Sequence, residues 1–150
     1  MGIQATLVLV CGLPASGKTT LAKRIERELP ALRLTPDDWM NGLGLNLWNE
    51  QKRAHIEALQ WQVAQRVLTL GISVVMDFGF WSRLERDRFR EEAKAIGVRV
   101  ELRFLDVPLE ELWTRVRQRN MESPPIHRAE LERWYRQFEP PSPEELNPGL

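Results

Sequence analysis

The chain has 150 residues, no formal net charge at pH 7, 43% hydrophobic residues and 28% charged residues. These values are typical of one soluble globular domain, and no apolar run is long enough to cross a membrane. The lack of a basic excess argues against tight, non-specific binding of long nucleic acids. The one cysteine, Cys11, excludes an internal disulfide and a cysteine-rich zinc site. We expect a cytoplasmic protein without a signal peptide, because the first apolar segment indicates a strand.

The segment from Gly12 to Thr19 fits the pattern G-x-x-x-x-G-K-[ST] of a phosphate-binding loop. A buried strand is predicted over 6–11 before it, and a helix over 20–29 after it. Glycines let backbone N–H groups converge on phosphate oxygens, and a helix N-terminus adds partial positive charge there. The residues predicted to bind ATP are Gly12, Pro14, Ala15, Ser16, Gly17, Lys18, Thr19 and Thr20. Lys18 is expected to reach the β- and γ-phosphates, and the Thr19 hydroxyl to bind Mg²⁺.

Strands and helices alternate along the rest of the chain. Further strands are predicted at 32–35, 72–76 and 98–105, and helices from about 36, at 50–70, at 82–96, from 106–108 to a break at 123–125, and at 127–138. This order predicts an α/β fold of three layers, α/β/α, with a mostly parallel sheet whose outer strand is 98–105. A kinase domain is expected over residues 1–138, followed by an extended, proline-rich tail over 139–150 on the surface.

The helix at 50–70 carries apolar residues at steps of three and four. These residues are Ile56, Leu59, Val63, Val67 and Leu70. They predict one buried stripe, with Trp61 well away from it.

Two aspartates follow predicted strands, at the sheet edge where α/β proteins bind ligands. Asp37 is a candidate to orient an acceptor hydroxyl and accept its proton, or alternatively a helix cap. Asp77 is a candidate to support Mg²⁺, or alternatively an acid that pairs with an arginine.

The helix after Pro108 carries two arginines on one face. Arg115 and Arg119 are candidates to close over a transferring phosphoryl group, as part of a helical lid. Alternatively, they belong to a solvated helix end, since Glu111 lies four residues before Arg115. Tryptophans at 39, 48, 61 and 81 are expected either in the core or in a pocket that stacks a ring.

Three features together resemble the small P-loop kinases, which include polynucleotide 5′-hydroxyl kinase domains, chloramphenicol phosphotransferase and zeta-toxin-like kinases. The features are the 12–19 loop, the run Pro36-Asp37-Asp38-Trp39, and the run from Asp106 to Leu112 before the arginine-rich helix. The resemblance extends over roughly residues 5–138. It implies a P-loop NTPase fold, ATP and Mg²⁺ as cofactors, Asp37 as the residue that activates the acceptor, and a lid arginine at Arg119 or Arg115.

The predicted activity is transfer of the γ-phosphate of ATP to a hydroxyl of a small ring-bearing molecule, a nucleoside or a nucleic acid end. A nucleic acid end is not favoured, because Pro36 and Met40 occupy positions where polynucleotide kinases carry arginines. A nucleotide-dependent ATPase or switch is the main alternative, and a binding module without turnover is another. The oligomeric state is left open by the sequence.

Overall fold

The computed structural model describes residues 4–147. The strands are β1 (Thr6–Cys11), β2 (Ala31–Leu34), β3 (Ser73–Gly79) and β4 (Arg99–Phe104). The helices are α1 (Lys18–Glu28), α2 (Pro36–Gly42), α3 (Glu50–Thr69), α4 (Arg83–Ala95), α5 (Leu109–Arg119), α6 (Arg128–Gln137) and α7 (Pro143–Leu146). Within these residues, no helix has the length and apolar character needed to cross a membrane.

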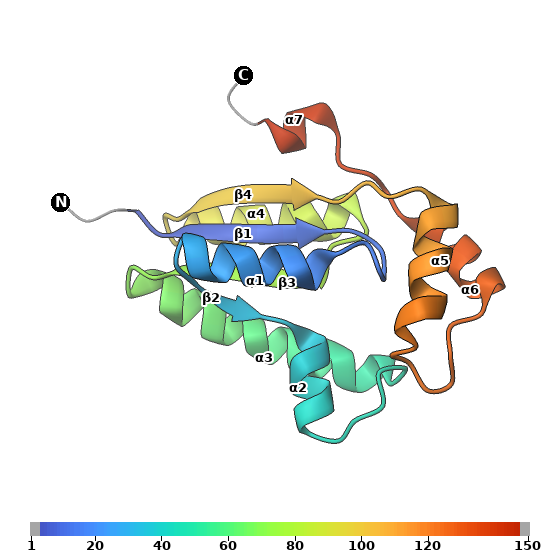
Figure 1. Cartoon of the computed structure of the whole chain (residues 1–150). Helices are drawn as coiled ribbons and strands as arrows, with labels where there is room; N and C mark the ends of the chain where they lie inside the picture. Colours follow the sequence, from blue (N-terminus) through green and yellow to red (C-terminus); the bar gives the residue numbers. More distant parts are fainter. Residues whose placement is uncertain (1–3, 148–150) are drawn as a thin grey trace.

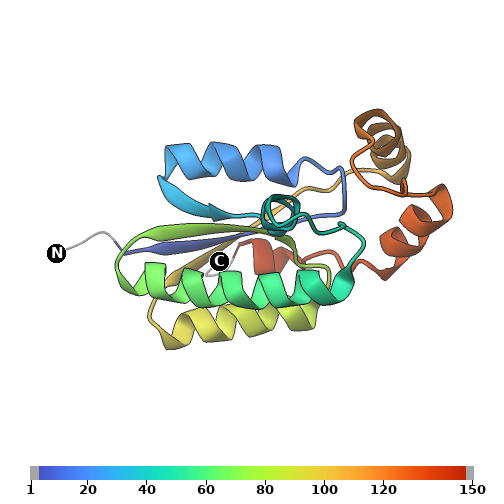
Figure 2. The ribbon, with the colours of Figure 1, turned by 90° about the horizontal axis from the view of Figure 1, so that it is seen from below.

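The strands form one parallel sheet in the order β2-β3-β1-β4. The arrows of β1 and β4 point toward α5 and α6, which stand beyond the carboxyl ends of the strands (Figure 1). Helix α1 covers one face of the sheet, and α3 and α4 cover the other (Figure 2). The predicted three-layer fold with a parallel sheet is therefore confirmed, and β4 is an outer strand as expected.

Strand β1 is central, and all six of its residues are buried. A strand covered by helices on both faces has no solvent-facing side, which explains its continuous apolar sequence. One cluster of buried residues lies between the sheet and α3, α4 and α5, and a smaller one lies under α1. The loops at the carboxyl edge of the sheet are thus attached to a rigid base.

The prediction for the buried face of α3 is confirmed for Ile56, which is 4% exposed, and for Val67, which packs on the core, but it is wrong for the other three residues of the stripe and for Trp61. Leu59 is 52% exposed and Val63 is 39% exposed, whereas Trp61 is only 6% exposed. The Trp61 ring packs edge-on against Phe89 of α4, with 4.9 Å between centroids. Apolar residues occur on two sides of this helix, and the side with the large indole is buried together with the polar Gln60.

The tail is also more ordered than predicted. Residues 143–146 form helix α7, which lies beside β4 (Figure 1). Glu145 is buried, and its carboxylate accepts hydrogen bonds from Arg86 at 2.8 and 3.3 Å and from Arg90 at 2.7 Å. The expectation of an extended surface tail is therefore wrong for this segment, while residues 148–150 lie outside the described part of the chain.

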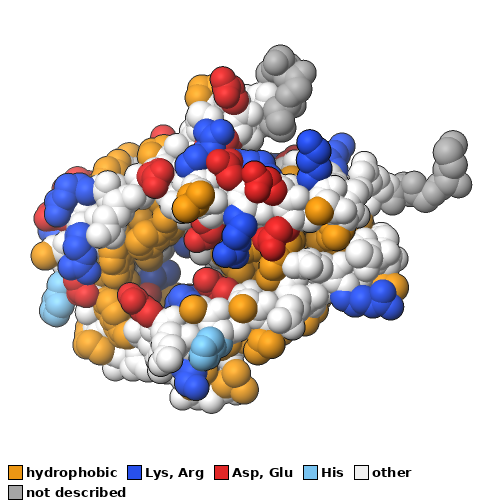
Figure 3. Space-filling model, turned by 180° about the vertical axis from the view of Figure 1, so that it is seen from behind, with side chains coloured by type: hydrophobic (Ala, Val, Ile, Leu, Met, Phe, Trp, Pro, Cys, Tyr) orange, Lys and Arg blue, Asp and Glu red, His pale blue; other side chains and the backbone are white. Residues whose placement is uncertain are grey.

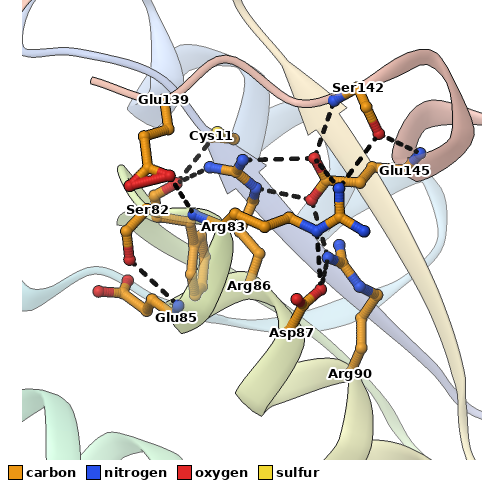
Figure 4. A network of polar contacts seen from close by, with 11 residues as sticks. Cys11, Ser82, Arg83, Glu85, Arg86, Asp87, Arg90, Glu139, Ser142 and Glu145 are labelled. Carbon is orange, nitrogen blue, oxygen red and sulfur yellow. Dashed lines mark hydrogen bonds and ion pairs between the residues drawn. The ribbon is translucent and has the colours of Figure 1, made fainter. Parts of the chain in front are cut away.

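The network around Arg86 joins three parts of the chain (Figure 4). Its guanidinium, almost completely buried, also donates to the carbonyl of Phe80 at 2.8 Å. Burial alone would raise the pKa of Glu145, but the hydrogen bonds from Arg86 and the Ser142 amide hold it at about 2. The ion pair therefore persists throughout the neutral range, and it connects the tail to the loop after β3.

We predict that Glu145→Ala lowers the free energy of unfolding by about 3–5 kcal/mol, because it leaves the buried Arg86 charge without a partner. The measurement is urea denaturation at pH 7. Glu144→Ala, at the exposed neighbouring position, is the matched control and is expected to change stability by less than about 0.5 kcal/mol. Equal effects of the two substitutions would contradict the prediction.

A second pair of substitutions tests the buried face of α3. Trp61→Ala is expected to cost about 3–5 kcal/mol, because it opens a cavity against Phe89. Leu59→Ala, on the exposed side, is expected to cost less than about 1 kcal/mol. Thermal or urea unfolding of both variants is the measurement, and a larger cost for Leu59→Ala would show that the helix is rotated relative to this description.

Candidate functional site

A cavity of about 1220 Å³ lies at the carboxyl ends of the strands. Its walls come from the loop after β1, the β2–α2 and β3–α4 connections, α3, α5 and α6. Figure 3 shows it as a deep hollow with hydrophobic side chains along one wall and charged side chains around its rim. Most predicted site residues meet here: Pro14, Ala15, Gly17, Lys18, Thr19, Thr20, Asp37, Asp77, Arg115 and Arg119 line the cavity.

The phosphate-loop segment has the backbone geometry that its sequence predicts. Ala15 and Gly17 have positive φ angles of 68° and 97°, which turn the chain sharply before α1 begins at Lys18. Gly12 and Ser16 lie beneath the loop rather than on the cavity wall, and a Cβ at Gly12 would come within 2.6 Å of the Ser16 hydroxyl. The curled backbone can therefore present several N–H groups to an anion at the start of α1.

Thr19 and Asp77 are in direct contact. The Thr19 hydroxyl donates to Oδ2 of Asp77 at 2.6 Å, and the Thr35 hydroxyl donates to the same oxygen at 3.3 Å. Asp77 is 5% exposed, and its Oδ1 has no partner within the described residues. No ion pair joins Asp77 to an arginine in residues 4–147, so the alternative reading of this acid finds no support.

Burial and nearby opposite charges act in opposite directions on the pKa values of Lys18 and Asp77. Burial lowers the pKa of the Lys18 ammonium, and the carboxylates of Asp77 and Asp37 oppose that shift. Burial likewise raises the pKa of Asp77, against the effects of Lys18 and of the two threonine hydroxyls. In the described structure, the Lys18 ammonium donates to the Leu13 carbonyl at 3.1 Å. A bound triphosphate would stabilise the charged form of Lys18.

The oxygens of Thr19 in α1 and Asp77 in β3 fit a magnesium ion. Mg²⁺ keeps several waters and is usually held by one or two protein oxygens together with substrate phosphates. Thr19 and the free Oδ1 of Asp77 provide such oxygens beside the phosphate loop. Among the described residues there is no group of three or more His, Cys, Asp or Glu side chains that could hold an ion by itself. The site is therefore suited to an ion that arrives with a nucleotide.

Asp37 lies in the first turn of α2, and the helix cap position is Thr35. The alternative role of Asp37 as that cap is therefore excluded. Its Oδ1 forms an ion pair with Arg53 of α3 at 2.7 Å, and Arg53 also donates to the Leu47 carbonyl at 3.1 Å. Sequence reasoning missed Arg53, because a charged residue in the first turn of a long helix is usually solvated.

The neighbouring Asp38 does a different job. It pairs with Arg33 of β2 at 2.7 Å, and Arg33 also contacts Glu26 at 3.0 Å and the Thr35 hydroxyl at 2.6 Å. The two adjacent aspartates thus face different arginines. Of these two ion pairs, only the one made by Asp37 joins α2 to α3, since Asp38 pairs with a residue of β2.

Both candidate lid arginines reach the cavity from α5. Arg115 donates to the Ala15 carbonyl of the phosphate loop at 3.3 Å and also pairs with Glu111 at 3.1 Å. Arg119 pairs with Glu122 at 2.5 Å, and its Nε has no partner within residues 4–147. The predicted pairing with Glu111 and the predicted approach to the loop therefore coexist at Arg115.

Aromatic side chains form another part of the cavity wall. Trp134 of α6 lies between Trp48 and Trp81, at centroid distances of 5.8 and 5.9 Å. The Trp48 indole N–H donates to the Pro124 carbonyl at 2.6 Å, which joins the α2–α3 and α5–α6 connections. Of the four tryptophans considered for a pocket, Trp48 and Trp81 line the cavity, whereas Trp61 is in the core and Trp39 lies outside.

Two carboxylates complete this side, which we call the aromatic half: Trp48, Trp81, Trp134, Glu57 and Glu85. The Glu85 backbone amide donates to the Ser82 hydroxyl at 3.1 Å, while the Glu85 side chain lines the cavity. Burial and the charge of Glu85 raise the pKa of Glu57 to about 7. Sequence analysis missed Glu57 and Trp134, because acids and aromatics on amphipathic helices carry no motif that separates a pocket from a surface.

The family profile described as AAA domain (AAA_33) matches residues 7–141. No curated protein matches the chain. The chain is similar to a kinase candidate from Chloroflexus aurantiacus, with a TM-score of 0.76, 23% identity, and coverage of 94% of this chain and 84% of that one.

Two further solved structures are similar. A gluconokinase from Sinorhizobium meliloti has a TM-score of 0.66 and 19% identity, over 97% of this chain and 81% of that one. A chain of the Pnkp1/Rnl/Hen1 RNA repair complex has a TM-score of 0.73 and 20% identity, over 91% of this chain and 45% of that one. These likenesses confirm the P-loop NTPase fold and the predicted resemblance to small kinases.

The raised pKa of Glu57 predicts a pH dependence. Because the folded state binds this proton more tightly than the unfolded chain does, Glu57 opposes folding increasingly as the pH rises from about 4.5 to about 7. Glu57→Gln removes that effect. The stability of the variant relative to the native protein is expected to rise by about 2 kcal/mol between pH 5 and pH 8, after allowance for solvent screening.

The measurement is urea denaturation of both proteins across this range. Glu91→Gln, at an exposed position of α4 outside the cavity, is the control and is expected to show no such change. A constant difference between the Glu57→Gln and native proteins at all pH values would contradict the prediction.

Proposed function

This chain belongs to the AAA domain family, and we propose that it is an ATP-dependent phosphotransferase that moves the γ-phosphate to a hydroxyl acceptor. The observation that carries this proposal is one continuous cavity, which is lined by the phosphate loop, by Asp37 and by the aromatic half. At about 1220 Å³ it exceeds the roughly 300–1,000 Å³ of a usual single-ligand pocket. It therefore has room for a nucleotide and a second substrate.

Each predicted residue has a role in this proposal. The loop amides and Lys18 bind the triphosphate, and Thr19 and Asp77 face the magnesium ion, which supplies charge neutralisation when it is bound. Asp37, oriented by Arg53, engages the acceptor hydroxyl. Arg115 and Arg119 approach from α5 and neutralise charge on the transferring group.

The reaction balances with these groups alone. The acceptor oxygen forms a bond to the γ-phosphorus, the bond between that phosphorus and the β–γ bridging oxygen breaks, and ADP leaves. The hydroxyl proton passes to the carboxylate of Asp37. Because the transition state of such transfers is largely dissociative, positioning and charge neutralisation contribute more than the strength of the base.

The main alternative is an ATPase or switch without an acceptor. The aromatic half argues against it, since hydrolysis needs no ring-binding wall beyond the phosphate loop. The acceptor classes considered are small ring-bearing molecules, nucleosides and, less favoured, nucleic acid 5′-hydroxyl ends. The next experiment separates them.

We predict that Asp37→Ala reduces γ-phosphate transfer by about 10²–10⁴-fold and leaves ATP affinity within about twofold, because Asp37 engages the acceptor rather than the nucleotide. The assay offers γ-labelled ATP and Mg²⁺ with 5′-hydroxyl oligonucleotides, nucleosides, sugars and ring-bearing antibiotics. Lys18→Ala is expected to weaken ATP binding itself. Asp38→Ala, whose carboxylate pairs with Arg33 instead, is the matched control and is expected to retain transfer.

Label on one acceptor, lost in the Asp37→Ala variant, supports the proposal and identifies the acceptor class. Label found only as free phosphate, at equal rates in both proteins, favours the ATPase alternative. Full transfer by the Asp37→Ala variant would remove Asp37 from the mechanism.

A further inference from the structure

We infer that the acceptor is a hydroxylated amine that binds as a cation: its ammonium lies at Glu57 and Glu85, and its apolar face lies on Trp48, Trp81 and Trp134. This inference rests on the proposed function and names the acceptor class. The chemistry described is that of an amino alcohol or amino sugar with an exposed hydroxyl. The amine is a recognition group, and the hydroxyl is the atom that reacts.

The aromatic half contains two acids without a direct ion-pair partner among the described residues. Neither Glu57 nor Glu85 has an ion-pair partner anywhere in residues 4–147, although both side chains are partly buried in the cavity wall. The cation nearest along α3, Arg53, is already held by Asp37 and by the Leu47 carbonyl. Arg133 is the other arginine of this half, and it lies at an exposed position of α6. Neither carboxylate is therefore neutralised by a direct ion pair within the described residues, although Arg88, which pairs with Glu92 at 3.5 Å, acts on both from α4.

The two acids lie close enough for the charge of Glu85 to raise the pKa of Glu57. Burial and the negative charges of Glu85 and Asp37 raise the pKa of Glu57, while Arg53 and Arg88 act in the opposite direction. Burial also raises the pKa of Glu85, against the charges of Arg88 and Arg86. A cation placed at these carboxylates would remove the repulsion and compensate for their desolvation.

Three tryptophans line the same cavity as the two acids. Tryptophan is the best of the aromatic side chains at binding cations through its ring face, and amines are often recognised by aromatic residues that surround them. Trp134 lies within 6 Å of both Trp48 and Trp81, measured between ring centroids, so the three indoles form a continuous surface. Three different segments contribute them: the α2–α3 loop, the β3–α4 loop and α6.

The two acids share one cavity with Asp37 and the phosphate loop. The same cavity contains the buried Asp77, whose Oδ1 has no partner within the described residues and marks the phosphate end. Asp37 lines the same cavity and lies near enough to both Lys18 and Glu57 for its charge to act on each. An acceptor whose ammonium is held at Glu57 and Glu85 can therefore direct a hydroxyl toward Asp37. An anionic acceptor would bring a further negative charge to two carboxylates that already repel each other.

The test uses matched probes that differ in charge: glucosamine and kanamycin as cationic amines, glucose as a neutral polyol, and gluconate and a 5′-hydroxyl dinucleotide as anions. Binding is measured by calorimetry at pH 7 with and without a non-hydrolysable ATP analogue, and transfer is measured with γ-labelled ATP. At least one cationic probe is expected to bind ten times more tightly than glucose, and the anions more weakly than glucose.

Variants then locate the interaction. Glu57→Gln and Glu85→Gln keep the side-chain volume and are each expected to weaken cation binding by at least tenfold, with glucose binding changed less than twofold. Trp134→Leu is expected to weaken binding of the cation further than that of glucose. Glu91→Gln, outside the cavity on α4, is the control and is expected to bind all probes as the native protein does.

Three outcomes overturn the inference: no cationic probe binds, the neutral or anionic probes bind as tightly, or the Glu57→Gln and Glu85→Gln variants keep the selectivity for cations. Failure of the proposed function is distinct from these. Cation binding that depends on both acids, without any transfer, supports this site and contradicts the phosphotransferase. Transfer to gluconate or to the dinucleotide supports the phosphotransferase and contradicts this inference.

Discussion

The buried guanidinium of Arg86 is the interaction on which the cavity depends. Its side chain is 1% exposed, and it holds both the carboxylate of Glu145 and the carbonyl of Phe80. The Cys11 thiol donates to that same carbonyl at 3.4 Å, and the Glu139 amide donates to the Trp81 carbonyl at 2.8 Å. A charge buried this deeply requires its partners, so the tail, the end of β1 and the loop after β3 are fixed together. The phosphate loop and the aromatic half are both attached to this support.

The order of strands then arranges the chemistry in a line along the sheet edge. Because β1 lies beside β3, the phosphate loop and Asp77 are neighbours, and the Thr19 hydroxyl reaches Asp77 at 2.6 Å. Because β2 lies on the other side of β3, Thr35 also reaches Asp77, and α2 brings Asp37 next in line. Parallel strands end at one edge, so the connections after β1, β3 and β2 bring the phosphate loop, Asp77 and Asp37 together along it.

The sequence predicted the parts of this site that depend on local backbone chemistry. The loop from Gly12 to Thr19 has a fixed spacing, because each residue serves the turn or the phosphates directly, and Asp77 follows from its place at a strand end. Arg53, Glu57 and Trp134 could not be predicted, since their contacts join helices far apart in the chain. Periodicity likewise failed for α3, where two apolar sides compete and only the packing of Trp61 on Phe89 decides which is buried.

This division has a chemical consequence. Asp37 is fixed by Arg53, and in the proposed transfer, which is largely dissociative, its strength as a base matters less than where it would hold the acceptor oxygen. In the proposed reaction the phosphate loop binds the nucleotide and does not contact the acceptor. Discrimination between hydroxyl compounds therefore has to arise in the aromatic half. In that proposal the recognition groups are two carboxylates and three indoles, and they lie on separate segments of the chain. In the proposed enzyme, substrate choice is therefore carried by the residues that have no motif, and nucleotide use by those that have one.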